Sequence, residues 1–205
     1  WVKVEPTMSL LQLDTATFDY SSTSALSYAD DTLTSSAMSH TLSKAEYTLP
    51  LYVECTLKPI TGGTTLLMTS DALNTYSHWK NNSANSVVWG TGGFGTSRYT
   101  WGISGSKSLD DQPVDPTVTE LTKFSMFVDD TQVIMYQGEG VEKYRFDRAT
   151  YPSFWNAVDA NGGKVRIGTW DWNDGVYTAY KTATYNPWVK VEPTMSLLQL
   201  DTATF

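Results

Sequence analysis

Trp170 and Trp172 are separated by one residue, and Asn173 follows them directly. In an extended segment, residues two positions apart share a face, so both indole rings would lie on one side of the chain. Exposed aromatic rings with nearby amides and carboxylates are typical of sugar-binding sites, so this spacing indicates carbohydrate binding. Trp79 and Trp101 lie in or beside predicted loops and join the candidate set. The competing explanation is structural, because tryptophan also fills the cores of β-sandwiches.

Four aspartates stand in predicted turns and offer oxygen ligands for a Ca²⁺ ion. Asp171 and Asp174 flank Asn173, while Asp129 and Asp130 form a predicted hairpin turn. Ca²⁺ binds several carboxylate and carbonyl oxygens, so both turns are candidate metal sites. Aspartate is also common in turns because its side chain bonds to the local backbone, which explains the same residues without a metal. No other cofactor is expected.

No residue pattern in the chain predicts catalysis. Glycoside hydrolysis needs two carboxyl groups flanking the scissile bond, but the adjacent pairs at 110–111 and 129–130 fall in a predicted loop and a predicted turn. The two histidines, His40 and His78, and the single cysteine, Cys55, lack the spacing of a zinc site. We therefore expect the protein not to be an enzyme.

The composition excludes several classes of partner. A net charge of −8 argues against nucleic acid and anionic membranes, which bind basic surfaces. No segment approaches the roughly 20 apolar residues of a membrane span, and no signal peptide is recognisable at the start. Few Lys and Arg beside 12 Tyr and 8 Trp are typical of β-rich extracellular proteins. We expect an extracellular or cell-surface location, and the glycosylation sequon at Asn81 agrees with it.

Alternating side chains predict an all-β protein. Leu51, Val53, Cys55 and Leu57 would face a core while the residues between them face outward, which is the pattern of a half-buried strand. Further strands are predicted at 86–90, 98–103, 121–128, 132–137, 164–169 and 176–185, with turns at 61–63, 129–130 and 171–175 and a long loop at 105–117. Short strands at spacings of about 8–12 residues predict an antiparallel β-sandwich or jelly roll.

Three segments together resemble the concanavalin A-like, laminin-G-type jelly roll. Segment 48–70 (TLPLYVECTLKPITGGTTLLMTS) resembles its strand–turn–strand, and segment 123–140 (KFSMFVDDTQVIMYQGEG) resembles its central hairpin. Segment 163–180 (GKVRIGTWDWNDGVYTAY) is similar to its late strand, turn and aromatic strand. The resemblance implies carbohydrate-binding, adhesive or structural roles and, in some members, glycan hydrolysis. The Glu-x-Asp-x-x-Glu motif of the hydrolase members does not occur in this sequence.

The stretch WVKVEPTMSLLQLDTATF occurs twice, at residues 1–18 and again at 188–205. An identical stretch of this length records a duplication, because packing alone tolerates many apolar sequences. Prolines at positions 6 and 193 split each copy into a closing segment and an opening strand. We therefore divide the chain into the end of a preceding repeat or linker (1–7), a β-sandwich domain (8–192) and the first strand of a following repeat (193–205, identical to 6–18).

The duplication predicts a structural role. One groove accepts one strand, so the second copy would pass to the next repeat or subunit, by covalent linkage or strand donation. An engineered duplication is a third explanation. We expect a repeat module of a long surface protein or filament whose partners are copies of itself. The alternative is a lectin-like module that binds glycans through exposed Trp and Asp loops. The residues expected to make the head-to-tail contact are Trp188, Val189, Val191, Met195, Leu197, Leu198, Leu200 and Phe205.

Overall fold

Every element that the structure describes is a β-strand. The structure is a computed structural model, and it describes residues 2–3, 8, 10–19, 25–37, 39–69, 86–92, 98–103, 106–113, 118–150, 164–183 and 188–189. The strands are β1 (Val2–Lys3), β2 (Phe18–Asp19), β3 (Leu26–Ala29), β4 (Thr32–Ser35), β5 (Ser39–Ser43), β6 (Leu51–Thr69), β7 (Ser86–Gly92), β8 (Arg98–Ile103), β9 (Ser106–Pro113), β10 (Thr122–Val128), β11 (Gln132–Gln137), β12 (Val141–Asp147), β13 (Lys164–Ala183) and β14 (Trp188–Val189). No helix among these residues has the length and apolarity needed to span a membrane. The predicted all-β antiparallel architecture is confirmed.

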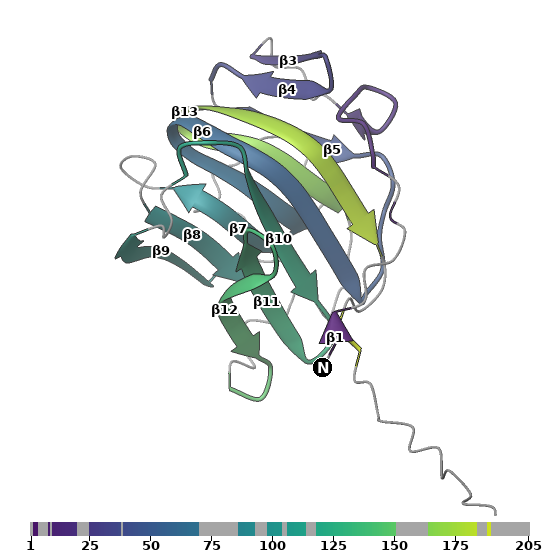
Figure 1. Cartoon of the computed structure of the whole chain (residues 1–205), viewed down its shortest axis with the longest axis vertical. Helices are drawn as coiled ribbons and strands as arrows, with labels where there is room; N and C mark the ends of the chain where they lie inside the picture. Colours follow the sequence, from purple (N-terminus) through teal and green to yellow (C-terminus); the bar gives the residue numbers. More distant parts are fainter. Residues whose placement is uncertain are drawn as a thin grey trace, which may run out of the picture.

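Two long antiparallel strands, β6 and β13, connect the two layers of the fold (Figure 1). The first half of β6 pairs with β10, and its second half pairs with β7. One layer therefore has the strand order β12-β11-β10-β6-β13-β4-β3. The other layer contains β9, β8, β7, the second half of β6, the first half of β13, β5 and β2. We call the first of these the front layer.

Two turns predicted from glycine and aspartate are absent, because each lies inside one of the long strands. The predicted turn at 61–63 belongs to β6, and the predicted turn at 171–175 belongs to β13. The strands pair with each other at both places, and the register is irregular between Trp170 and Asp174. Glycine in a strand commonly marks a bend or bulge, so the same residues that suggested a turn lie where the strands leave one layer for the other.

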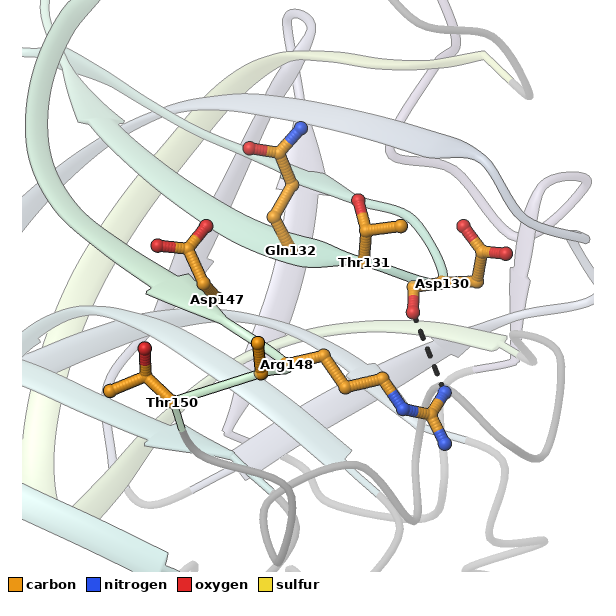
Figure 2. A pocket seen from close by; sticks show the side chains of 7 residues that line it. Asp130, Thr131, Gln132, Asp147, Arg148 and Thr150 are labelled. Carbon is orange, nitrogen blue, oxygen red and sulfur yellow. Dashed lines mark hydrogen bonds between the residues drawn. The ribbon is translucent and has the colours of Figure 1, made fainter.

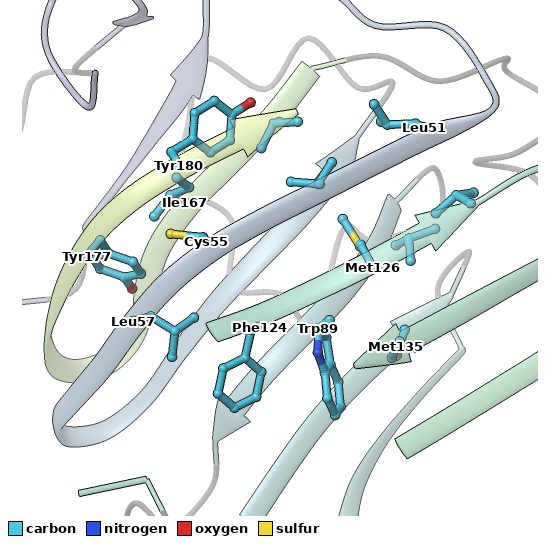
Figure 3. Close-up of a cluster of buried hydrophobic side chains, with 14 of the residues drawn as sticks. Leu51, Cys55, Leu57, Trp89, Phe124, Met126, Met135, Ile167, Tyr177 and Tyr180 are labelled. Atoms are coloured by element: carbon cyan, nitrogen blue, oxygen red, sulfur yellow. The ribbon is translucent and has the colours of Figure 1, made fainter. Parts of the chain in front are cut away.

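The core lies between the two layers. Leu51, Val53, Cys55 and Leu57 are all fully buried there, which confirms the predicted inward face of this strand. Figure 3 shows Leu51, Cys55 and Leu57 beside aromatic and sulfur-containing residues of β7, β10, β11 and β13. The buried indole of Trp89 donates a hydrogen bond to the backbone carbonyl of Tyr136 at 2.8 Å, so its polar atom has a partner inside the core.

Local hairpins complete the layers. The predicted hairpin around Asp129 and Asp130 is confirmed as β10 and β11. The short strands and loops predicted for 19–45 are seen as β2 to β5. The predicted loop at 105–117 is wrong over Ser106–Pro113, which forms β9 by pairing with β8. Ser, Lys and Asp favour neither strand nor core, so this strand depends on its partner rather than on its own sequence.

Candidate functional site

The register of the front layer places a row of polar side chains on its outer face, away from the core. Residues directly opposite each other in neighbouring antiparallel strands share a face. Glu54 lies opposite Ser125 of β10 on one side and opposite Lys181 of β13 on the other. Cys55, the next residue along β6, points into the core. Glu54 and its opposite residues therefore belong to the outer face.

Glu54 is a carboxylate held by three partners. Its residue is only 4% exposed. The hydroxyl of Tyr52 donates to Glu54 Oε2 at 2.9 Å. The ammonium group of Lys123 lies 3.4 Å from Oε2, and that of Lys181 lies 3.4 Å from Oε1. We call Tyr52, Glu54, Lys123 and Lys181 the Glu54 cluster. A buried charge is tolerated when it is paired and hydrogen-bonded in this way.

A β-bulge brings Lys181 to this cluster. The register of β13 against β6 shifts between Thr178 and Lys181, and Ala179 has a left-handed φ of 49°. A bulge adds one residue to its strand and redirects the side chains that follow. As a result Tyr180 is buried in the core while Lys181 faces the carboxylate of Glu54.

Lys123 connects two carboxylates. It lies 2.7 Å from Glu139 Oε1, in addition to its contact with Glu54. Partial burial alone would lower the pKa of Lys123. The hydrogen bond to Glu139 and the negative charges of Glu54 and Glu139 outweigh that effect, so the pKa of Lys123 is raised above its usual value. Lys123 therefore stays charged and holds the two carboxylates close together.

An apolar patch adjoins the cluster on the same face. It consists of Tyr52, Phe127, Ile134 and Tyr136, all buried, and Met8 packs against them. Phe127 lies opposite both Tyr52 and Ile134 in the register, which places the patch across β6, β10 and β11. The outer face therefore combines aromatic and charged side chains, although its aromatic rings are covered.

An open pocket of about 610 Å³ lies where β11 begins and β12 ends (Figure 2). Gln132 is two positions from Ile134, so this pocket borders the apolar patch on the outer face. The guanidinium of Arg148 donates to the backbone carbonyl of Asp130 at 3.4 Å. We call this feature the Gln132 pocket. Its lining residues are Asp130, Thr131, Gln132, Asp147, Arg148, Ala149 and Thr150.

The structure separates the roles of the two aspartates predicted in the hairpin turn. Asp129 Oδ1 accepts hydrogen bonds from the backbone amides of Thr131 and Gln132 at 2.7 and 2.8 Å, and from the hydroxyl of Thr131 at 2.7 Å. This is the local turn bonding typical of aspartate. Asp130 is exposed and lines the Gln132 pocket. Within the described part of the chain, no three His, Cys, Asp or Glu residues gather as a metal site, and calcium binding stays a prediction.

The other predicted site residues are only partly described. Trp101 lies in β8 opposite Trp89. Five of the predicted residues lie in β13: Trp170, Asp171, Trp172, Asn173 and Asp174. For all six, the structure describes the backbone and not the side chain. Trp79 and the segment from Val191 to Phe205 lie outside the described residues. Sequence reasoning missed the Glu54 cluster. The alternation in β6 placed Glu54 on the outward face, but strand pairing brings its two lysines from segments far along the chain.

No protein-family model matches the chain, and no curated protein matches it. Solved structures do match its fold. A β-glucanase from Bacillus licheniformis superposes with a TM-score of 0.60 at 11% identity, covering 87% of this chain and 97% of the glucanase. The Crh5 transglycosylase gives a TM-score of 0.63 at 11% identity, covering 88% and 82%. The carbohydrate-binding module CBM66 from Bacillus subtilis gives 0.53 at 13%, covering 87% and 98%.

The fold is the concanavalin A-like jelly roll. This confirms the resemblance found in the sequence, and it corrects two expectations about function. The expected role as a structural repeat or filament module is overturned, because the similar structures are named for acting on or binding carbohydrates. The expectation that the protein is not an enzyme is overturned by the same glucanases and transglycosylases. The alternative of a carbohydrate-binding module fits these structures better.

Proposed function

We propose that the domain binds carbohydrate in the Gln132 pocket, at the border of the outer face of the front layer. The observation that carries this proposal is the open pocket of about 610 Å³, whose size lies in the usual range for small-ligand sites. The residues that line it carry carboxylates, a guanidinium, an amide and hydroxyl groups (Figure 2). Such groups can form two hydrogen bonds at once with neighbouring hydroxyl groups of a sugar, as donors or as acceptors.

The glycan class follows from the chemistry of the lining. Asp130 and Asp147 are exposed carboxylates that accept from hydroxyl groups, and Arg148 and Gln132 donate. With two carboxylates and one cation, the pocket favours a neutral sugar over an acidic one. An extracellular or cell-surface setting suits this activity and belongs to the same proposal.

Titration calorimetry against soluble β-glucan, mucin O-glycans and N-acetylglucosamine oligomers tests the proposal. We expect at least one neutral glycan to bind. Asp147→Asn should weaken that binding about tenfold, because a hydrogen bond to a charged group contributes about 1.5 kcal/mol. Asp19→Asn is the matched control, since Asp19 is exposed in β2, outside the pocket. Absence of binding across the panel, or equal affinities for the Asp147 variant and the parent, would contradict the proposal.

Glycan hydrolysis is a second candidate, favoured by the two carboxylates that Lys123 joins. Retaining glycosidases place two carboxyl groups about 5–5.5 Å apart. Glu54 Oε2 and Glu139 Oε1 can be no farther apart than the sum of their 3.4 and 2.7 Å distances from Lys123 Nζ. Glu54 is almost wholly buried, which ranks hydrolysis behind binding. Release of reducing ends from β-glucan that disappears in both Glu54→Gln and Glu139→Gln would reverse this ranking.

A further inference from the structure

The first copy of the duplicated stretch is an integral part of the domain. The backbone amide of Leu11 donates to the carbonyl of Tyr180 at 3.0 Å. Leu13 and Phe18 are buried in the core between the layers. The ring of Phe18 meets that of Tyr180 edge-on, with centroids 5.0 Å apart. Residues 8–18 therefore occupy a docking site made by the rest of the domain.

The groups that fit this site all lie inside the duplicated sequence. Asp14 Oδ1 accepts from the backbone amides of Ala16 and Thr17 at 3.0 Å each and shapes the turn that leads to Phe18. The carbonyl of Thr17 accepts from the amide of Lys44 at 2.9 Å. Residues 195–205 repeat residues 8–18 letter for letter. The second copy therefore carries every side chain that the site recognises.

The start of the second copy lies beside the start of the first. β1 and β14 pair antiparallel, with Val2 opposite Val189. Val189 is the equivalent of Val2 in the second copy. Residues 2 and 8, like residues 189 and 195, are separated by the same number of positions. Both copies therefore begin one strand spacing apart and have the same number of residues before the docking segment, although antiparallel strands leave the pair in opposite directions.

We propose that this docking site accepts either copy, and that residues 195–205 replace residues 8–18 within the same chain when the first copy is displaced. The two copies are chemically identical, so their contacts in the site are equal. The first copy also continues directly into Asp19, which pairs with Leu42 of β5, so the first copy holds the site in the parent and the second copy enters when the first is weakened. This inference goes beyond glycan binding and does not depend on it.

Thermal unfolding of four full-length forms tests the proposal: the parent, Phe18→Ala, Phe205→Ala and the double variant. Truncating a buried Phe typically lowers the midpoint of a domain of this size by about 10 °C. We expect Phe205→Ala to unfold within about 2 °C of the parent, and Phe18→Ala to lose clearly less than the double variant, because the intact second copy then occupies the site. The unfolding midpoint of the double variant should fall by the full amount expected for a truncated buried Phe. If Phe18→Ala alone loses as much as the double variant, or does not fold, the proposal is wrong.

Two further measurements determine which copy occupies the docking site. Leu33→Ala, another fully buried core residue outside both copies, should lower the midpoint equally with or without Phe205→Ala. In hydrogen exchange followed by mass spectrometry, the amides of 195–205 should become protected in Phe18→Ala but stay exchangeable in the parent. Protection that rises with protein concentration would show docking between two chains, which overturns replacement within one chain.

Discussion

At the scale of single residues, Glu54 shows how a carboxylate is accommodated on a nearly closed sheet face. Tyr52 donates to it, and two lysines approach it from neighbouring strands. Removing one member of a buried ionic group leaves the others uncompensated, which costs more than the group contributes as a whole. The cluster therefore constrains which substitutions the outer face tolerates.

Glu54→Gln should lower the free energy of unfolding by about 2 kcal/mol. Breaking a fully buried ion pair costs about 3–5 kcal/mol, and we reduce this because Lys123 and Lys181 keep 22% and 33% of their side-chain exposure. Urea denaturation measures the difference. The control is Glu142→Gln, whose ion pair with Arg145 is largely exposed and should contribute less than about 0.5 kcal/mol. Equal effects of the two substitutions would contradict the special role of Glu54.

At the scale of elements, two Asp-Asp turns illustrate what local sequence predicts. Asp129 and Asp130 stand between alternating apolar runs, and the hairpin expected there is confirmed. Asp30 and Asp31 connect β3 and β4 with left-handed φ values of 50° and 57°. Large apolar residues are sparse around them, with only Leu26, Tyr28 and Leu33 in the two short strands, so the sequence predicted only short strands and loops there. A hairpin can be recognised in a sequence when its turn residues are flanked on both sides by strands that alternate apolar and polar side chains.

The same substitution should have opposite effects in the two turns. Asp31→Gly should stabilise the protein by about 0.5–1 kcal/mol, because glycine adopts positive φ without the steric cost of a side chain. Asp129→Gly should destabilise it by about 1–2 kcal/mol, because three turn hydrogen bonds to Asp129 Oδ1 disappear. Chemical denaturation of both variants checks the signs. A loss of stability in Asp31→Gly would show that its carboxylate contributes more than its backbone geometry costs.

At the scale of the whole molecule, two strands carry the connection between layers. The inward face of Leu51 to Leu57 could be predicted, because alternation reports burial directly. The length of β6 and β13 could not, since glycine indicates a turn unless a partner strand continues beside it. The Glu54 cluster was equally inaccessible, because its members come from three strands distant in sequence. The sequence thus predicted the inward face of β6, whereas the structure shows which strands meet and that Tyr52 and Glu54, expected to face outward, are buried as well.

Stability should fall as the pH rises above about 9. Burial, followed by the charge of Glu54, raises the pKa of the Cys55 thiol, and burial raises the pKa of Tyr180. Above the ordinary pKa values the unfolded chain releases these protons while the folded chain retains them, so unfolding becomes easier by up to about 1.4 kcal/mol per pH unit per group. Urea midpoints between pH 8 and 10.5 measure the slope. Cys55→Ala should reduce it, and an unchanged slope in that variant would contradict this account.

The pairing of Val2 with Val189 also has a geometric consequence for any longer polypeptide that contains this domain. Opposite residues in an antiparallel pair lie about 5 Å apart. The chain therefore passes through nearly the same point at residues 2 and 189, so the part of the domain between them adds almost nothing to the distance between these two positions. Under tension applied across Val2 and Val189, which lie opposite each other, the two short strands would separate one hydrogen bond at a time rather than shear together.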